Sequence, residues 1–167
     1  MKKIFHIGIL KNNLGGVSAY INLIKNLKIN KIKNIILCKN SKKKYTINFD
    51  FSYNLFTFLF KLIELYKIIK NSNIKNIHAH TQKAGLLAAF LKLFIFDISI
   101  IYTPHGLRHS QLKFIKKIFH FLVELFIFSR VNNIIIISKF EKKIIERNIL
   151  LKKFKYIYIP TAIKLPK

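Results

Sequence analysis

Residues 76–103 read NIHAHTQKAGLLAAFLKLFIFDISIIYT and contain a strand, a helix and a second strand in that order. Residues 76–81 are a short, mostly apolar run, residues 83–96 are rich in Ala and Leu, and residues 98–103 are again short and mostly apolar. Short runs that flank a longer helical segment are typical of a strand–helix–strand unit with two parallel strands.

The same alternation continues on both sides of this unit. Further strands are predicted at residues 3–10, 34–38, 45–49, 133–138 and 156–160. Further helices are predicted at residues 17–27, 53–70, 111–128 and 139–148. Strands that alternate with helices in this way form a parallel sheet with helices on both faces, so we expect a single α/β domain.

Two of these helices carry local signals. Ser138 is a good N-cap, and Glu141, three residues later, completes a capping box. The helix at 53–70 is expected to bury an apolar face made of Leu55, Phe58, Leu59, Leu62, Ile63, Tyr66 and Ile69.

The chain is strongly basic. Its 167 residues include 31 Lys+Arg against 6 Asp+Glu, a formal net charge of +25. Such a charge suggests nucleic acid or an anionic membrane surface as a partner. Because nearly all of it is lysine spread over the whole length, we attribute it mainly to a general bias in composition. In either case the surface should attract anionic lipids, phosphates and acidic partners.

The expected location is cytoplasmic, with a peripheral position on the inner face of the cell membrane as an open alternative. Cys38 is the single cysteine, which excludes an intrachain disulfide, and its apolar surroundings favour a core position. The apolar run after Lys2-Lys3 is too short for a secretory signal. No stretch has the roughly 18 uncharged apolar residues of a membrane span.

Three loops each follow a predicted strand. They are residues 13–16 (NLGG), 78–81 (HAHT) and 103–106 (TPHG). Ligands of open α/β sheets bind where parallel strands end, so these loops predict one shared site.

Gly15 and Gly16 are placed to hold a diphosphate, because glycine lets the backbone approach a ligand and the next helix offers free N–H groups. A tight turn is the alternative. The dinucleotide fingerprint G-x-G-x-x-G and the P-loop ending G-K-[ST] are both absent.

His105 is the stronger candidate for a ligand contact. Pro104 ends the strand and Gly106 allows a turn, which would present the imidazole to a ligand hydroxyl or carbonyl. His78 and His80 share one face of their strand. Since no third ligand is evident near them, no metal is expected, and we interpret His80 as shaping a pocket and His78 as packed. The other histidines receive structural interpretations as strand core, loop surface and helix side: His6, His109 and His120.

Ser138 also lies at a helix N-terminus that should point into the same crevice. A Ser-His-Asp triad does not fit, because Asp50 and Asp97 are the only aspartates and no G-x-S-x-G motif occurs.

Taken together, the ordered motifs resemble the N-terminal domain of GT-B glycosyltransferases of family four. They are N-x-G-G before a helix, HAHTxKAGLLA, IYTPHG, IIISKFEK and a closing I-P-x-x-I. The resemblance covers nearly the whole chain and implies a Rossmann-like domain.

It also implies retaining transfer of a sugar from a nucleotide-sugar to a glycan or lipid-linked acceptor, of the hexosyltransferase type, in cell-surface polysaccharide synthesis. By position, Gly15 and Gly16 would lie near the donor diphosphate and His105 near the reacting sugar. His80, Thr81, Lys83 and Ser138 would border the acceptor side. Such enzymes usually need no metal or other cofactor, because helix dipoles and basic side chains stabilise the leaving diphosphate.

The chain departs from this pattern in two ways. Residues 159–163 read IPTAI where relatives typically have I-P-N-G-I. We also expect the donor-binding domain to be absent, so that residues 1–167 are the acceptor-side half, inactive alone and in need of a separate donor-binding half. A fragment, one subunit of a split enzyme and a relative that only binds all fit this expectation.

Two other classes of function stay open. One is a non-enzymatic basic module that binds nucleic acid or an anionic membrane. For nucleic acid it has the charge but lacks an RNA-binding aromatic signature, a zinc site or a clear helix-turn-helix, so we expect no nucleic-acid partner. The other is a different Rossmann-like enzyme, which the missing glycine fingerprint argues against.

Overall fold

The computed structural model describes residues 2–8, 17, 20–21, 32–38, 46–49, 54, 56–107 and 112–160. Gly15 and Gly16, His109, most of the helix predicted at 17–27, and the closing residues 161–167 lie outside these ranges. So does the side chain of Cys38. Residues 17, 20 and 21 are helical, as predicted.

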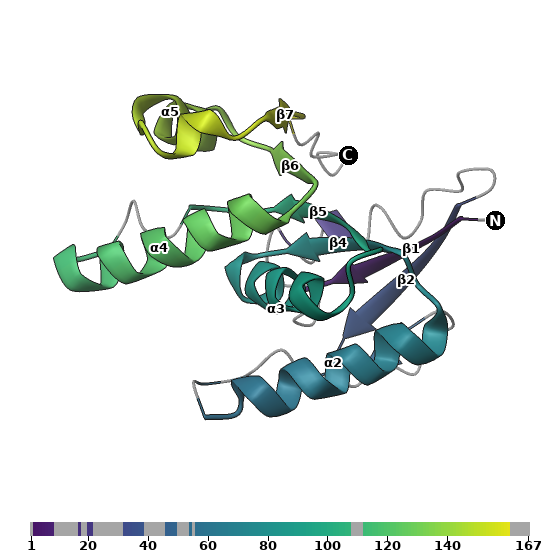
Figure 1. Ribbon diagram of the computed structural model, residues 1–167. Helices are drawn as coiled ribbons and strands as arrows, with labels where there is room; N and C mark the ends of the chain where they lie inside the picture. Colours follow the sequence, from purple (N-terminus) through teal and green to yellow (C-terminus); the bar gives the residue numbers. More distant parts are fainter. Residues whose placement is uncertain are drawn as a thin grey trace, which may run out of the picture.

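The fold is a single parallel sheet with strands in the order β3-β2-β1-β4-β5-β6-β7 (Figure 1). Every pairing between neighbouring strands is parallel. The strands are β1 (Lys2–Ile7), β2 (Ile32–Cys38), β3 (Thr46–Asn48), β4 (Asn76–His80), β5 (Ser99–Thr103), β6 (Asn133–Ile136) and β7 (Tyr156–Tyr158). This is the predicted α/β architecture.

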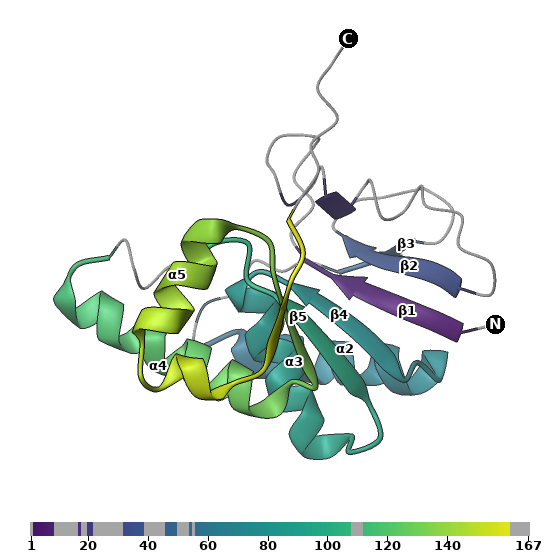
Figure 2. The same ribbon diagram turned by 90° about the horizontal axis from the view of Figure 1, so that it is seen from above.

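The helices are α2 (Phe58–Ser72), α3 (Gln82–Phe94), α4 (Phe114–Arg130), α5 (Lys139–Arg147) and a short 3-10 turn, η2 (Leu151–Lys153). Helix α3 lies between α2 and α4 and contacts both (Figure 2). None of the described helices is long and apolar enough to cross a bilayer.

Strands β4 and β5 form the middle of the core. Ile77, Ala79, Ile100 and Tyr102 are each at most 1% exposed. Helix α3 packs on them through its small residues, and a Cβ placed on Gly85 would lie 2.6 Å from Cε2 of Tyr102. Glycine at this position therefore lets the helix lie directly on the aromatic ring.

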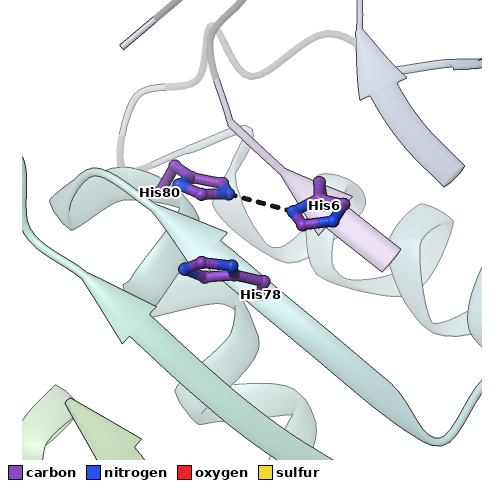
Figure 3. A group of neighbouring side chains, drawn as sticks. All are labelled: His6, His78 and His80. Carbon is purple, nitrogen blue, oxygen red and sulfur yellow. Dashed lines mark hydrogen bonds between the residues drawn. The ribbon is translucent and has the colours of Figure 1, made fainter. Parts of the chain in front are cut away.

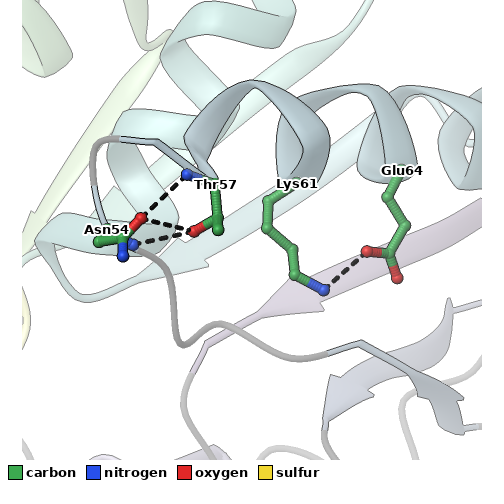
Figure 4. A network of polar contacts seen from close by, with 4 residues as sticks. All are labelled: Asn54, Thr57, Lys61 and Glu64. Atoms are coloured by element: carbon green, nitrogen blue, oxygen red, sulfur yellow. Dashed lines mark hydrogen bonds and ion pairs between the residues drawn. The ribbon is translucent and has the colours of Figure 1, made fainter.

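The predicted start and buried face of α2 are partly wrong. The helix begins at Phe58 and not at residue 53, because Asn54 and Thr57 exchange hydrogen bonds in the turn before it (Figure 4). The Asn54 amide donates to Oγ1 of Thr57 at 3.0 Å, and the Thr57 amide donates to Oδ1 of Asn54 at 2.9 Å.

Leu62, Leu65 and Ile69 face the core, whereas Leu59 and Ile63 are exposed. A run this rich in apolar residues matches more than one helical face, and packing against α3 selects one. Lys61, which is partly buried, forms an ion pair with Glu64 at 2.8 Å (Figure 4).

The strand order reverses direction at β1. The chain runs outward from β1 to β2 and β3, then returns to β4 on the other side of β1. The carboxyl ends of β1 and β4 therefore border the crevice in which ligands of such sheets bind.

Candidate functional site

Three buried histidines meet at this reversal point. His6 on β1 is directly opposite His78 on β4, and His80 is two residues further along β4. All three are at most 6% exposed, and their rings lie together between the two strands (Figure 3). The sequence pattern predicted a strand-core position for His6. It is buried as predicted, but it belongs to a cluster of imidazoles.

A hydrogen-bonded chain leads from this cluster to the surface. Nε2 of His6 lies 3.1 Å from Oδ1 of Asn34, and Nδ1 of His6 lies 3.2 Å from Nε2 of His80. Nδ1 of His80 then lies 3.2 Å from Nε2 of His105. His80 is thus fully buried, and among the described residues His105 links it to the carboxyl edge of the sheet.

The rings of this chain are neutral near pH 7. Burial lowers the pKa of His105 to about 4, and it also lowers the pKa of His6 and of His80. The amide oxygen of Asn34 only accepts, so His6 donates to it from Nε2 and accepts at Nδ1. Each following ring then donates from Nε2, which leaves Nδ1 of His105 as an acceptor at the end of the chain.

The loop that carries His105 has an unusual backbone. His105 has φ +54° and Gly106 has φ +112°, both in the left-handed region. Such a conformation costs free energy for a residue with a side chain and is found where the surroundings enforce it. The predicted turn at this position is therefore present, with His105 half-buried at the carboxyl edge of β5.

Glu141 holds this loop. Its buried carboxylate accepts from the amide of Gly106 through Oε1, and from the amides of Ile137 and Ser138 through Oε2. The Oγ of Ser138 in turn accepts from the amide of Glu141 at 3.1 Å, so the predicted capping box is confirmed. Ser138 acts as a cap in the structure, and its role toward an acceptor stays a prediction.

Thr81 lies at the junction of β4 and α3. It has φ +80°, and its Oγ1 is buried without a hydrogen-bond partner among the described residues. A buried hydroxyl without a partner is costly, so it is a natural contact for a bound ligand. Lys83, two residues later, is exposed on the first turn of α3.

Tyr20 covers the histidines from the helical segment after β1. Its ring centroid lies 5.0 Å from that of His105 and 5.7 Å from that of His80. Tyr20 falls in the helix predicted at residues 17–27 and was not predicted as a site residue.

A second polar network lies beneath α3 and α4. Tyr102 and Gln82 donate to the two oxygens of the buried Glu124, each at 2.8 Å. Burial raises the pKa of this carboxyl to about 7. The network joins side chains of β5, α3 and α4, which only the tertiary structure brings together.

Of the predicted site residues, the structure brings His80 and His105 together. Thr81 lies at the end of β4 and Ser138 lies after β6, on opposite sides of β5. The sequence did not indicate Asn34, Glu141 or Tyr20 as residues of the site. Glu141 could have been suspected, because a capping-box glutamate beside a glycine loop can accept further amides. Asn34 and Tyr20 carried no signal, since their contacts depend on strand order.

Comparison with protein families matches residues 14–166 to the model of Glycosyltransferase Family 4. A search of curated proteins found no match.

Solved structures share the fold. Sucrose-phosphate synthase (tll1590) from Thermosynechococcus elongatus superposes with a TM-score of 0.77 at 15% identity over 99% of this chain and 49% of that one. MurG from Acinetobacter baumannii gives a TM-score of 0.53 at 10% identity over 82% of this chain and 41% of that one. The chain thus spans about half the length of these proteins. At such identities the likeness concerns the fold alone.

Proposed function

The chain belongs to glycosyltransferase family 4, and on that premise we propose that residues 1–167 form the acceptor-side half of a glycosyltransferase. The reaction proposed is transfer of a hexose from a nucleotide-sugar to a glycan or lipid-linked acceptor in cell-surface polysaccharide synthesis. No resident cofactor is assigned to the transfer step, since the nucleotide-sugar is a co-substrate.

The main support for this proposal is the arrangement of hydrogen bonds around His105. A neutral imidazole stands at the end of β5, with its Nε2 held by His80 and its Nδ1 left as an acceptor. A neutral ring can accept a hydrogen bond from a sugar hydroxyl close to the reacting carbon. His80 acts by orienting His105, while Thr81, Lys83 and Ser138 are proposed to line the acceptor side.

The donor is assigned to a second domain that faces this crevice. We propose that Gly15 and Gly16 approach the donor diphosphate from this half, and that the nucleotide binds mainly to the other half. The similarity to about half of a sucrose-phosphate synthase chain supports such a division. The second domain belongs either to the same polypeptide or to a partner subunit.

The test is a transfer assay with uridine and guanosine diphosphate sugars and with free and lipid-linked oligosaccharide acceptors. The 167-residue chain alone should transfer no sugar, whereas its fusion to the donor-side half of a family relative should. In that fusion His105→Ala should lower kcat about 100-fold or more. His120→Asn, which keeps the contact of His120 with Gln82, is the control.

Robust transfer by the chain alone would contradict the proposed division into halves. Transfer by the fusion that is unaffected by His105→Ala would contradict the role of His105. Duplex DNA binding that falls steeply with salt, without any transfer by the fusion, would favour the alternative of a basic binding module.

Helix α4 supports a position on an anionic membrane. Phe114, Ile115, Ile118, Phe119 and Leu122 form an exposed apolar face on its amino-terminal half, with Phe114 76% and Ile115 82% exposed. Exposed lysines lie among them at Lys113, Lys116 and Lys117. An apolar face bordered by lysines is the composition of helices that lie in the interface of anionic bilayers.

Cosedimentation with vesicles of anionic or neutral lipid tests this part. The pair Phe114→Ser and Phe119→Ser should weaken binding to anionic vesicles. The matched control is Phe94→Ser and Phe96→Ser, which removes two comparably exposed rings elsewhere. Equal binding by both double variants would show that α4 is not the contact.

A further inference from the structure

We propose that His6, His78 and His80 form a binding site for one divalent transition-metal ion of the zinc type, behind the crevice and apart from the acceptor. The sequence offered only the pair His78 and His80. Strand order supplies His6 as the third imidazole, because β1 and β4 are neighbours and His6 is directly opposite His78.

The distances suit one ion. The three ligand nitrogens lie within 4.8 Å of one another. Nδ1 of His6 and Nε2 of His80 are 3.2 Å apart. Two imidazoles on a tetrahedral zinc ion have their nitrogens about 3.3 Å apart, since each Zn–N bond is about 2.0 Å. His6 and His80 thus already have the required spacing, and the ring of His78 lies beside that of His80, with ring centroids 4.0 Å apart (Figure 3).

Each ring also has an outer partner on its other nitrogen. Asn34 accepts from Nε2 of His6, Oγ1 of Thr103 lies 2.9 Å from Nε2 of His78, and His105 lies 3.2 Å from Nδ1 of His80. Metal-ligating histidines are held in this way, with one nitrogen on the ion and the other on a hydrogen-bond partner.

The type of ligand atom determines which metal ion fits the site. A neutral imidazole has the lone pair that a metal needs. Three nitrogen ligands suit zinc, copper, nickel or cobalt, and are poor ligands for magnesium or calcium. A solvent molecule would complete four-coordination.

Metal binding would change the end of the histidine chain. With the ion on Nε2 of His80, the proton of that ring must lie on Nδ1, which then donates to Nε2 of His105. His105 would carry its own proton on Nδ1 and become a donor toward the crevice. The number of protons stays the same, but the hydrogen bond that His105 offers is reversed.

The test is titration of the untagged, chelator-treated chain with Zn²⁺ and Co²⁺, with X-ray absorption of the loaded protein. We expect one ion per chain with a Kd of about 1 μM or tighter. The absorption spectrum should show three imidazole nitrogens. His6→Gln and His78→Gln keep an amide near Asn34 and Thr103 but remove the nitrogen that faces the ion, so each should raise Kd about tenfold or more.

His120→Asn is the matched control and should bind as the parent does. Absence of a site at micromolar metal, or fewer than three nitrogen ligands in the parent chain, would overturn the proposal. Unchanged affinity in the folded variants would do the same. The spectrum of the parent chain decides the question even if the variants do not fold, and no outcome depends on sugar transfer.

Discussion

Two carboxylates are buried among the described residues, and their surroundings differ. Glu141 accepts three backbone amides and thereby joins the His105 loop to α5. Glu124 accepts from two side chains beneath α3 and α4. The first therefore positions the candidate site, whereas the second affects the stability of the helix layer.

Glu124 should make stability depend on pH. Its pKa rises from 4.5 to about 7 on folding, so the folded state binds the proton more tightly and loses stability as pH increases from 4.5 to 7. The loss is about 3 kcal/mol at most. Glu124→Gln should remove this part of the pH dependence in urea unfolding at pH 5 and pH 8. Glu64→Gln, which removes a carboxyl from α2, is the control. Identical profiles for parent and Glu124→Gln would contradict the prediction.

Glu141→Gln should destabilise the protein and loosen the His105 loop. The amide group of glutamine presents a donor toward one of the three backbone donors, which leaves that N–H unpaired at a cost of about 2 kcal/mol. Hydrogen exchange at Gly106 should accelerate along with the lower stability. Glu146→Gln, at an exposed position on the same helix, should change neither. Unchanged exchange at Gly106 would mean that the loop is held by other contacts.

At the scale of elements, small residues decide how α3 sits on the sheet. Ala84, Ala88 and Ala89 are fully buried, and Gly85 lies against the face of Tyr102. Such close packing brings the first turn of α3, with Thr81 and Lys83, to the end of β4. The way α3 lies on the sheet, and with it the position of Lys83, therefore depends on Gly85.

Gly85→Ala should destabilise the protein, although alanine is the better helix former by about 1 kcal/mol. The new methyl group would lie 2.6 Å from Tyr102, and overpacking of this kind costs about 1–3 kcal/mol. Thermal unfolding measures the net effect. Phe94→Ala, at an exposed position of the same helix, should leave the melting temperature nearly unchanged. A more stable Gly85→Ala protein would show that the ring can move aside.

At the scale of the molecule, the net charge of +25 has a cost. Lysines greatly outnumber acidic residues, so the compact state repels itself more than the unfolded chain does. Three ion pairs among the described residues offset only part of this: Lys61–Glu64, Lys75–Asp97 and Lys142–Glu146.

Salt should therefore stabilise the folded chain. At about 0.15 M salt the screening length is about 8 Å, short enough to weaken repulsion between neighbouring lysines. The melting temperature should rise between low salt and 0.15 M sodium chloride. Sodium sulfate at equal ionic strength separates specific anion binding from screening. A melting temperature that falls with sodium chloride would show that the ion pairs outweigh the repulsion.

Much of the architecture could be predicted, because it depends on local pattern. The unit at 76–103 appears as β4, α3 and β5 within two residues of the predicted ends. The capping box of Ser138 and Glu141 follows from spacing alone. The start of α2 could not be predicted from the apolar pattern, because the reciprocal hydrogen bonds of Asn54 and Thr57 compete with a first helical turn there.

By itself, the sequence determined the alternation of strands and helices, the turn at Pro104 to Gly106, and the position of His80 and His105 at strand ends. Only the tertiary structure decided that His6, 74 residues before His80, lies 3.2 Å from it, and that Glu141 reaches Gly106. The physical reason is that some of these features depend on residues close in sequence and others on residues far apart. Local periodicity reports which residues face a core, whereas contacts between strands depend on the order and register that the whole sheet adopts.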